Sequence, residues 1–132
     1  MYSIERQPYG FRLVLGEFIK KEEMSAWVND SRKALAQAPK GFGVLVDMRT
    51  LKPLTPDSKA VMEDGQKLYK GAGMLRSVVI LDSALLTMQF KNIAKETGIY
   101  QWERYLSTAT HPDWEELALA WLTQGTDPDK KG

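Results

Sequence analysis

The chain has 132 residues, of which 43% are hydrophobic and 27% charged, an ordinary composition for one globular domain with a single core. Its 18 Lys and Arg residues nearly balance its 17 Asp and Glu residues, so the net charge is +1 and nucleic acid is not an expected partner. The absence of cysteine excludes disulfides, thiolate metal sites and cysteine nucleophiles.

The N-terminal segment, "MYSIERQPYG", has neither the basic start nor the apolar centre of a signal peptide. No stretch of the sequence is long and apolar enough to be expected to cross a bilayer as a helix. We therefore expect a cytoplasmic protein with no transmembrane segment.

Apolar periodicity predicts a hairpin and then a helix in the first part of the chain. "YSIER" alternates, and "FRLVLGEFI" resumes the alternation after "PYG", which predicts two strands joined by a Pro-Tyr-Gly turn. Over 21–37 the apolar side chains follow one helical stripe, and two glutamates lie in the first turn, where the helix dipole favours negative charge. The stripe consists of Met24, Trp27, Val28, Ser31 and Leu35.

The middle of the chain predicts a buried strand and a capped helix. "FGVLVDM" is a short apolar run rich in valine, typical of a strand covered by helices on both faces. Thr55 suits an N-cap, Pro56 suits the first helical position, and Asp57 favours the positive end of a helix. A helix over 55–70 is therefore expected, with "KGAG" at its end.

The last part of the chain repeats the alternation of strand and helix. "MLRSVVIL" predicts a strand, and Asp82 or Ser83 can cap the helix that follows and ends at Gly98. The expected inner stripe of that helix is Leu86, Phe90, Ile93 and Ala94. "ERYLST" predicts a short strand and "HPDWEELALAWLTQG" a final helix. Its expected inward residues are Trp114, Leu117, Ala118, Trp121 and Leu122.

The predicted order of elements is β-β-α-β-α-β-α-β-α. Strands that alternate with helices imply a mainly parallel sheet with right-handed crossovers, and the opening hairpin makes the sheet mixed. We expect an α/β fold with a sheet of about five strands and four helices. A single domain is expected to span 1–125, followed by a polar C-terminal tail over 126–132.

Four segments occur in an order that resembles a known family. They are "LVLGEF", "VLVDMRTL" leading into "TPDSKAVMEDG", "RSVVIL", and "ERYLSTATHPDWEELALAWL", and they cover nearly the whole chain. In this order the chain resembles the STAS-like (SpoIIAA-like) family, which comprises the anti-sigma-factor antagonist domains and many small bacterial relatives. The family is sometimes described together with Sec14-like lipid-binding domains. The resemblance implies a non-enzymatic regulatory module, with a kinase or an anti-sigma-like regulator as its protein partner.

The resemblance also draws attention to one serine. In the antagonists, a serine just inside the helix after the third strand is phosphorylated, and Asp57-Ser58 falls at the matching place. Ser58 is therefore the implied phospho-acceptor, and its phosphate would meet the positive end of the helix dipole. Lys59 and Ala60 depart from the family's small-residue and glycine continuation. The alternative interpretation is that Thr55 to Ser58 form an ordinary capping sequence.

Candidate binding residues follow the central strand. Ligands and partners of open α/β sheets collect beyond the carboxyl ends of the strands, which favours the segment from Asp47 to Ser58. Within it, Asp47, Arg49, Thr55 and Asp57 are candidates for binding a partner or ligand. Arg49 can equally serve as a structural partner for a nearby carboxylate.

Aromatic residues suggest a second set of candidates. Tyr100 and Trp102 lie between a helix end and a short strand, where large aromatic side chains fit an interface or a pocket mouth. Such exposed aromatics also favour a homodimer. Tryptophan and methionine side chains either fill the core or line a pocket for a small apolar or lipid-like ligand, as the Sec14-like resemblance implies. The residues concerned are Trp27, Trp102, Trp114, Trp121, Met62, Met74 and Met88.

No residue pattern predicts catalysis. His111 is the one histidine, and its place beside Pro112 at the start of a helix suits a cap or an exposed position. Neighbouring carboxylates on a helix diverge by about 100° and cannot converge on one substrate atom. The sequence has no Walker motif, nucleophile elbow or metal-ligand spacing. We therefore expect a binding protein with no cofactor and no metal.

Overall fold

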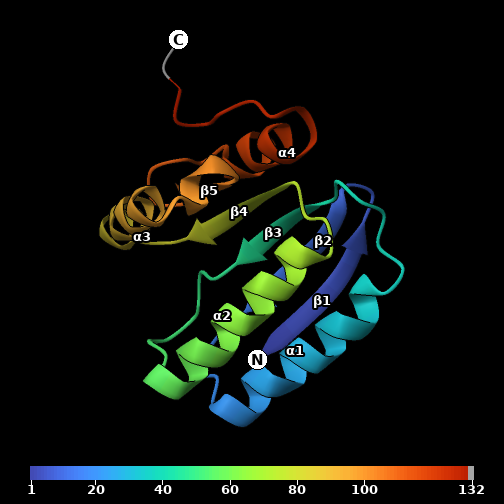
Figure 1. Ribbon diagram of the computed structural model, residues 1–132. Helices are drawn as coiled ribbons and strands as arrows, with labels where there is room; N and C mark the ends of the chain where they lie inside the picture. The colour runs from blue at the N-terminus through green and yellow to red at the C-terminus, as the bar shows by residue number, and fades with distance from the viewer. Residues whose placement is uncertain (131–132) are drawn as a thin grey trace.

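The computed structural model describes residues 1–130, which form one α/β domain built on a five-stranded sheet (Figure 1). The elements are β1 (Tyr2–Gln7), β2 (Gly10–Leu15), α1 (Lys21–Leu35), β3 (Gly43–Asp47), α2 (Pro56–Gly71), β4 (Arg76–Leu81), α3 (Ala84–Thr97), the 3-10 helix η1 (Ile99–Gln101), β5 (Glu103–Ser107) and α4 (Trp114–Gln124). The predicted fold class, element order and N-terminal hairpin are confirmed. No helix within the described residues is both long and apolar enough to cross a membrane.

The strands lie in the order in which they occur in the chain. β1 is antiparallel to β2, and β2, β3, β4 and β5 are parallel to one another. Each of the three parallel connections leads to the adjacent strand on the same side. Because all three crossovers are right-handed, α1, α2 and α3 lie on one face of the sheet. Helix α4 packs on the other face, against β3, β4 and β5 (Figure 1). The carboxyl ends of β2 to β5 therefore meet at one edge of the sheet.

The larger core lies between the sheet and the pair α1 and α2. All five residues of the stripe predicted for 21–37 are buried, including Ser31, whose Oγ accepts a 2.7 Å hydrogen bond from the Tyr69 hydroxyl. The Trp27 ring stacks on the Tyr69 ring with centroids 5.9 Å apart. α2 approaches α1 closely at Gly65, where a Cβ would lie 2.2 Å from Cζ3 of Trp27. The two helices can pack this closely because Gly65 has no side chain.

The inner stripe predicted for the third helix is partly wrong. Ala94 is buried and Phe90 packs edge-on against the ring of Tyr105, but Leu86 and Ile93 are 37% and 55% exposed. The helix buries Thr87 instead, because the Thr87 hydroxyl donates a 2.7 Å hydrogen bond to the Ser83 carbonyl and needs no other partner. α3 packs on β4, β5 and η1, and Leu86 and Ile93 lie on the part of the helix that these elements do not cover.

The smaller core lies under α4 and agrees largely with the prediction. Ala118, Trp121 and Leu122 are buried, while Trp114 and Leu117 are half-buried. The segment predicted as a polar tail is ordered over 126–130 and crosses the outer edge of β5 (Figure 1). The last two residues of the predicted tail, 131 and 132, lie outside the described residues.

Candidate functional site

The carboxyl end of β3 carries a rigid charged pair. Asp47 is the last residue of the strand and is nearly buried. Arg49 donates to Asp47 Oδ1 from its backbone N at 3.1 Å and from Nε at 3.0 Å, and to Oδ2 from Nη2 at 2.8 Å. Arg12 on β2 places Nη2 3.8 Å from the same carboxylate. The structural pairing of Arg49 that the sequence left open is therefore present.

This pairing keeps Asp47 ionised. Burial alone would raise the pKa of Asp47, but the hydrogen bonds and the positive charge of Arg49 outweigh burial and hold that pKa below its ordinary value. Asp47 accepts three hydrogen bonds from Arg49 and forms an ion pair with Arg12, so it is not free to act as a base. The effect of the Asp47–Arg49 pair is to hold the Arg49 side chain in one orientation.

The outer side of Arg49 is available for contact. Its guanidinium carbon lies 5.0 Å from the ring centroid of Trp114, the first residue of α4, and the side chain is 37% exposed. Arg12 continues the network to α4 through Glu115, 3.5 Å away. The geometry presents a half-exposed Arg–Trp pair whose arginine is fixed by a salt bridge.

The loops beside this pair are joined by backbone hydrogen bonds. The N–H of Glu17 donates to Thr50 O at 3.0 Å, and the N–H of Lys52 donates to Glu17 O at 2.9 Å. Glu17 has φ +59, in the left-handed region that costs a non-glycine residue energy unless its surroundings fix it. The next residue, Phe18, is 55% exposed. The loop that carries Arg49 is thus held against the loop after β2.

Large apolar side chains are exposed along the same edge of the sheet. Phe18 follows β2, and Leu85, 68% exposed, follows β4 in the first turn of α3. We call the residues Phe18, Arg49, Leu85 and Trp114, which follow the carboxyl ends of the four parallel strands, the carboxyl-edge surface. Sequence reasoning missed Phe18 and Leu85, because the sequence does not show which apolar residues remain exposed. It also missed the pairing of Trp114 with Arg49, because the two residues are far apart in the sequence.

The start of α2 is a helix cap with a buried serine. The backbone N–H of Ser58 donates to Thr55 Oγ1 at 3.4 Å and to Asp57 Oδ1 at 2.9 Å, which confirms the capping interpretation. Hydrogen bonds from the Thr55 hydroxyl and from Ser58 N–H lower the pKa of Asp57. Thr55 and Asp57 are exposed.

Ser58 itself is 0% exposed, and its Oγ donates a 2.9 Å hydrogen bond to the Ile19 carbonyl. This bond ties the start of α2 to the segment before α1. A kinase cannot reach this hydroxyl in the folded conformation, because the phosphoryl group must approach the oxygen that faces Ile19. Phosphorylation of Ser58 would therefore require the contact between the two helix starts to open first.

Tyr100 and Trp102 lie at the opposite, amino-terminal edge of the parallel sheet, because both precede β5. The Tyr100 hydroxyl donates to Asp129 Oδ2, and the Nζ of Lys70 lies 4.3 Å from the ring centroid of Trp102. The predicted candidates therefore divide into two groups. Asp47, Arg49, Thr55 and Asp57 belong to the carboxyl edge, and the two aromatic residues do not.

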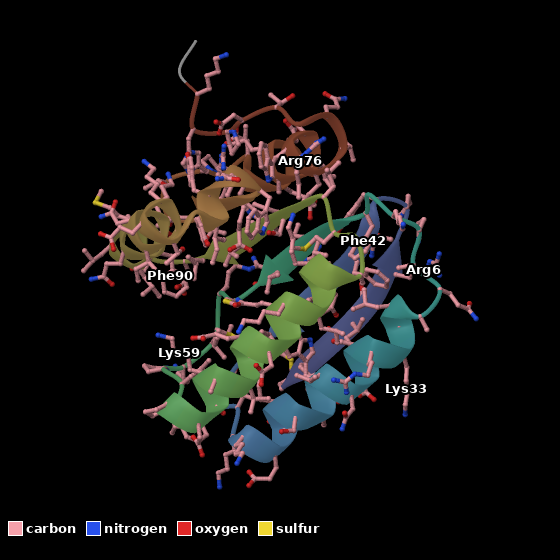
Figure 2. The ribbon with its side chains drawn as sticks, in the orientation of Figure 1. Arg6, Lys33, Phe42, Lys59, Arg76 and Phe90 are labelled. Atoms are coloured by element: carbon pink, nitrogen blue, oxygen red, sulfur yellow. The ribbon has the colours of Figure 1, made fainter. Side chains whose placement is uncertain are left out.

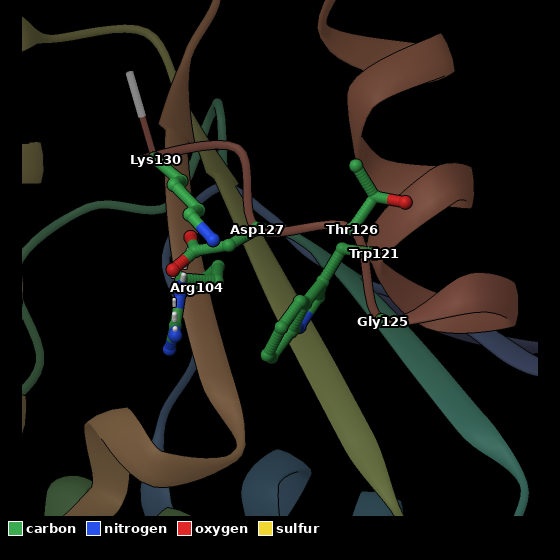
Figure 3. Close-up of a pocket in the computed structure, with 6 residues that line it drawn as sticks. All are labelled: Arg104, Trp121, Gly125, Thr126, Asp127 and Lys130. Carbon is green, nitrogen blue, oxygen red and sulfur yellow. Dashed lines mark hydrogen bonds and ion pairs between the residues drawn. The ribbon is translucent and has the colours of Figure 1, made fainter. Parts of the chain in front are cut away.

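The tryptophan and methionine side chains do not share one pocket. Trp27 and Met74 are buried in the larger core, Trp121 is buried under α4, and Met88 is 61% exposed on α3. A hollow beside α4 is open and takes only Trp121 from this set of side chains, with Arg104, Gly125, Thr126, Asp127 and Lys130 completing its lining (Figure 3). Carriage of an apolar ligand and formation of a homodimer stay predictions, to be tested by native mass spectrometry and light scattering.

β5 carries a partly covered carboxyl group that sequence reasoning missed. Glu103 Oε1 accepts a 2.7 Å hydrogen bond from Ser77 Oγ, and Oε2 accepts one from the Tyr105 hydroxyl. Burial raises the pKa of Glu103 above its ordinary value of 4.5, and the two hydroxyl bonds oppose that rise without cancelling it. Nothing in the sequence indicates the contact between Glu103 and Ser77, since Ser77 lies on the neighbouring strand.

The substitution Glu103→Gln is expected to change the pH dependence of stability. A carboxyl whose pKa is higher in the folded chain binds more protons when folded, so the free energy of unfolding falls as pH rises above 4.5. Glutamine does not titrate, and the variant should lose this part of the slope. Urea unfolding at several pH values between about 4.5 and 8 measures it. A difference between variant and wild type that stays constant with pH would contradict the assignment.

Comparison of the chain with protein-family models, curated proteins and solved structures returned no significant match.

Proposed function

We propose that the protein is a non-enzymatic, STAS-like interaction domain that contacts a regulatory protein through its carboxyl-edge surface. The observation that carries the proposal is the half-exposed Arg49–Trp114 pair, fixed by Asp47. Arg and Trp are the residue types most enriched at the energetic centres of protein interfaces. Because Arg49 is already held in place, little side-chain freedom would be lost on binding.

The surroundings of the pair support a protein partner. Phe18 and Leu85 expose apolar area along the same edge, and apolar area around a fixed cation is typical of contact surfaces. The matching partner surface would combine an acidic group for Arg49 with apolar side chains. The likeness of the element order to the anti-sigma-factor antagonists favours a kinase or an anti-sigma-like regulator as this partner.

Site-specific crosslinking in the source cells tests the proposal. A photoreactive amino acid at position 18 or 85 is expected to capture one protein that the same probe at position 33 does not capture. Position 33 is a suitable control because Lys33 points away from the molecule on the outer side of α1 (Figure 2). Equal capture from all three positions would contradict the proposed surface.

The variant Arg49→Glu tests the centre of that surface. It reverses the charge that meets the partner, and a central interface residue costs about 2 kcal/mol or more when lost, so capture should fall by about tenfold or more. Arg32→Glu is the matched control, because Arg32 is exposed on α1 and bonds only to Asn29 among the described residues. Circular dichroism must show that both variants are folded. Unchanged capture by a folded Arg49→Glu variant would show that Arg49 does not contribute to the contact.

A further inference from the structure

A second charged cluster lies at the outer edge of β5, away from the carboxyl-edge surface. Arg104 on β5 is 9% exposed and donates to Asp127 from Nε at 2.8 Å and from Nη2 at 3.2 Å (Figure 3). Lys91 on α3 lies 2.9 Å from Asp129 Oδ1, and the Tyr100 hydroxyl donates to the other oxygen of Asp129. Both aspartates belong to residues 126–130, which we call the acidic strap.

One of the groups that hold the strap, Arg104, is fixed independently of it. Arg104 Nη1 donates to the carbonyls of Tyr100 and Glu103. Its guanidinium carbon lies close to two aromatic rings, 3.8 Å from the centroid of Tyr100 and 4.3 Å from that of Trp121. A guanidinium that is packed against two rings, with its Nε and Nη2 donating to the two oxygens of Asp127, is preorganised for bidentate binding of a carboxylate.

The charge balance also points to an acidic ligand. Besides Arg104 and Lys91, the cluster includes Lys95, with Nζ 5.0 Å from the Tyr100 centroid, and Arg76, 5.7 Å from the Trp121 centroid. If the strap left, the nearly buried Arg104 would lose its carboxylate partner, which is costly for a buried charge. The site therefore favours exchange of one acidic segment for another over an empty state.

The strap is joined to the domain in a way that lets it detach. α4 ends at Gln124, the next residue Gly125 has φ +70, and the strap continues beyond it as turns without regular structure. Three side-chain anchors described above, Arg104, Lys91 and Tyr100, hold it. Because they act only through the two aspartates, neutral side chains at 127 and 129 would weaken the strap while leaving Arg104, Lys91 and Tyr100 intact.

We propose that Arg104, Lys91 and Tyr100 form a recognition site for an acidic peptide segment of a second protein, with two aspartates separated by one residue. The chain's own strap occupies this site and competes with that segment. An intramolecular competitor acts at an effective concentration of about millimolar, so a partner segment must bind more tightly or be present at high local concentration. The site is separate from the carboxyl-edge surface, and either can fail without the other.

The test uses the full chain with Asp127→Asn and Asp129→Asn, which neutralises the strap. The probe is a fluorescent peptide, TDPDK, and fluorescence anisotropy measures its binding. We expect the double variant to bind at least about tenfold more tightly than wild type, because its own strap no longer competes. The peptide TNPNK should bind neither protein, and added salt should weaken TDPDK binding. Equal binding of TDPDK by both proteins, or of both peptides by the variant, would overturn the proposal.

Two further measurements keep the test decisive. Lys91→Gln in the double variant removes one anchor on the surface of α3 and should weaken TDPDK binding by about threefold or more. If the double variant does not fold, Asp129→Asn alone should still improve TDPDK binding over wild type, and no improvement would count against the site. Light scattering that shows wild type forming dimers, and the double variant forming none, would reassign the site to a second copy and overturn the partner proposed.

Discussion

The variant Gly65→Ala is expected to lose about 2 kcal/mol of unfolding free energy, although alanine favours a helix interior by about 1 kcal/mol over glycine. The reason is the contact between α2 and α1. The new Cβ would lie 2.2 Å from Cζ3 and 2.6 Å from Cη2 of Trp27, whose ring is buried and stacked on Tyr69. Neither ring can move away without disturbing the larger core, so overpacking outweighs helix propensity.

Urea unfolding followed by circular dichroism measures the loss, and Gly71→Ala is the matched control. Gly71 is the last residue of the same helix, and no atom lies within 4 Å of the position its Cβ would take. That variant should be neutral or gain up to about 1 kcal/mol. In a Trp27→Phe background, Gly65→Ala should cost less, because the smaller ring removes the contact. Equal costs in the two backgrounds would place the strain elsewhere.

The fold could be predicted because the spacing of apolar residues within each segment indicates a helix or a strand. The stripe from Met24 to Leu35 has the period of a helix with one buried face, and all of it is buried. The inner stripe predicted for α3 was wrong at Leu86 and Ile93 because it counted apolar residues alone. Thr87 faces inward once its hydroxyl bonds to the Ser83 carbonyl, and the edge position of α3 leaves Leu86 and Ile93 uncovered. Which flank of a helix has no neighbour is a property of the packed domain.

In the candidate site too, contacts between residues close in the sequence could be predicted, and contacts between distant residues could not. Asp47 ends β3 and Arg49 follows two residues later, so a pairing of Arg49 with a nearby carboxylate could be predicted. The contact of Ser58 Oγ with Ile19 O joins residues 39 positions apart, and Arg104 meets Asp127 across 23 positions. Such contacts depend on how the helices and strands pack in the folded domain. The sequence predicts only a polar tail over 126–132, because the partners of Asp127 and Asp129 lie far from them in the sequence.

The variant Ser58→Asp is expected to lose about 3 kcal/mol or more of unfolding free energy. The carboxylate would enter a position that is 0% exposed and would face the Ile19 carbonyl, an acceptor that offers it no proton. The positive end of the α2 dipole offsets at most about 2 kcal/mol of this cost. Because burial raises the pKa of such a carboxyl, the loss should shrink as pH falls and the group becomes protonated.

Urea unfolding at pH 7 and pH 5 measures both effects, and Ser83→Asp is the matched control. Ser83 caps α3 through a 3.1 Å hydrogen bond from the N–H of Leu86 and is only half-buried, and aspartate caps a helix about as well as serine does. The control should therefore change stability little. Ser58→Ala, which leaves the Ile19 carbonyl without its donor, should cost about 1–2 kcal/mol.

These values decide how an effect of Ser58→Asp on partner binding must be interpreted. If the variant loses both stability and binding, the loss of binding reports a loosened α2 start and not a phosphate switch. A switch at Ser58 requires that the two quantities separate, so that the variant keeps its stability while losing its partner. Phosphate found on Ser58 in a chain that stays fully stable would show that the contact with Ile19 opens at little cost, contrary to the burial described here.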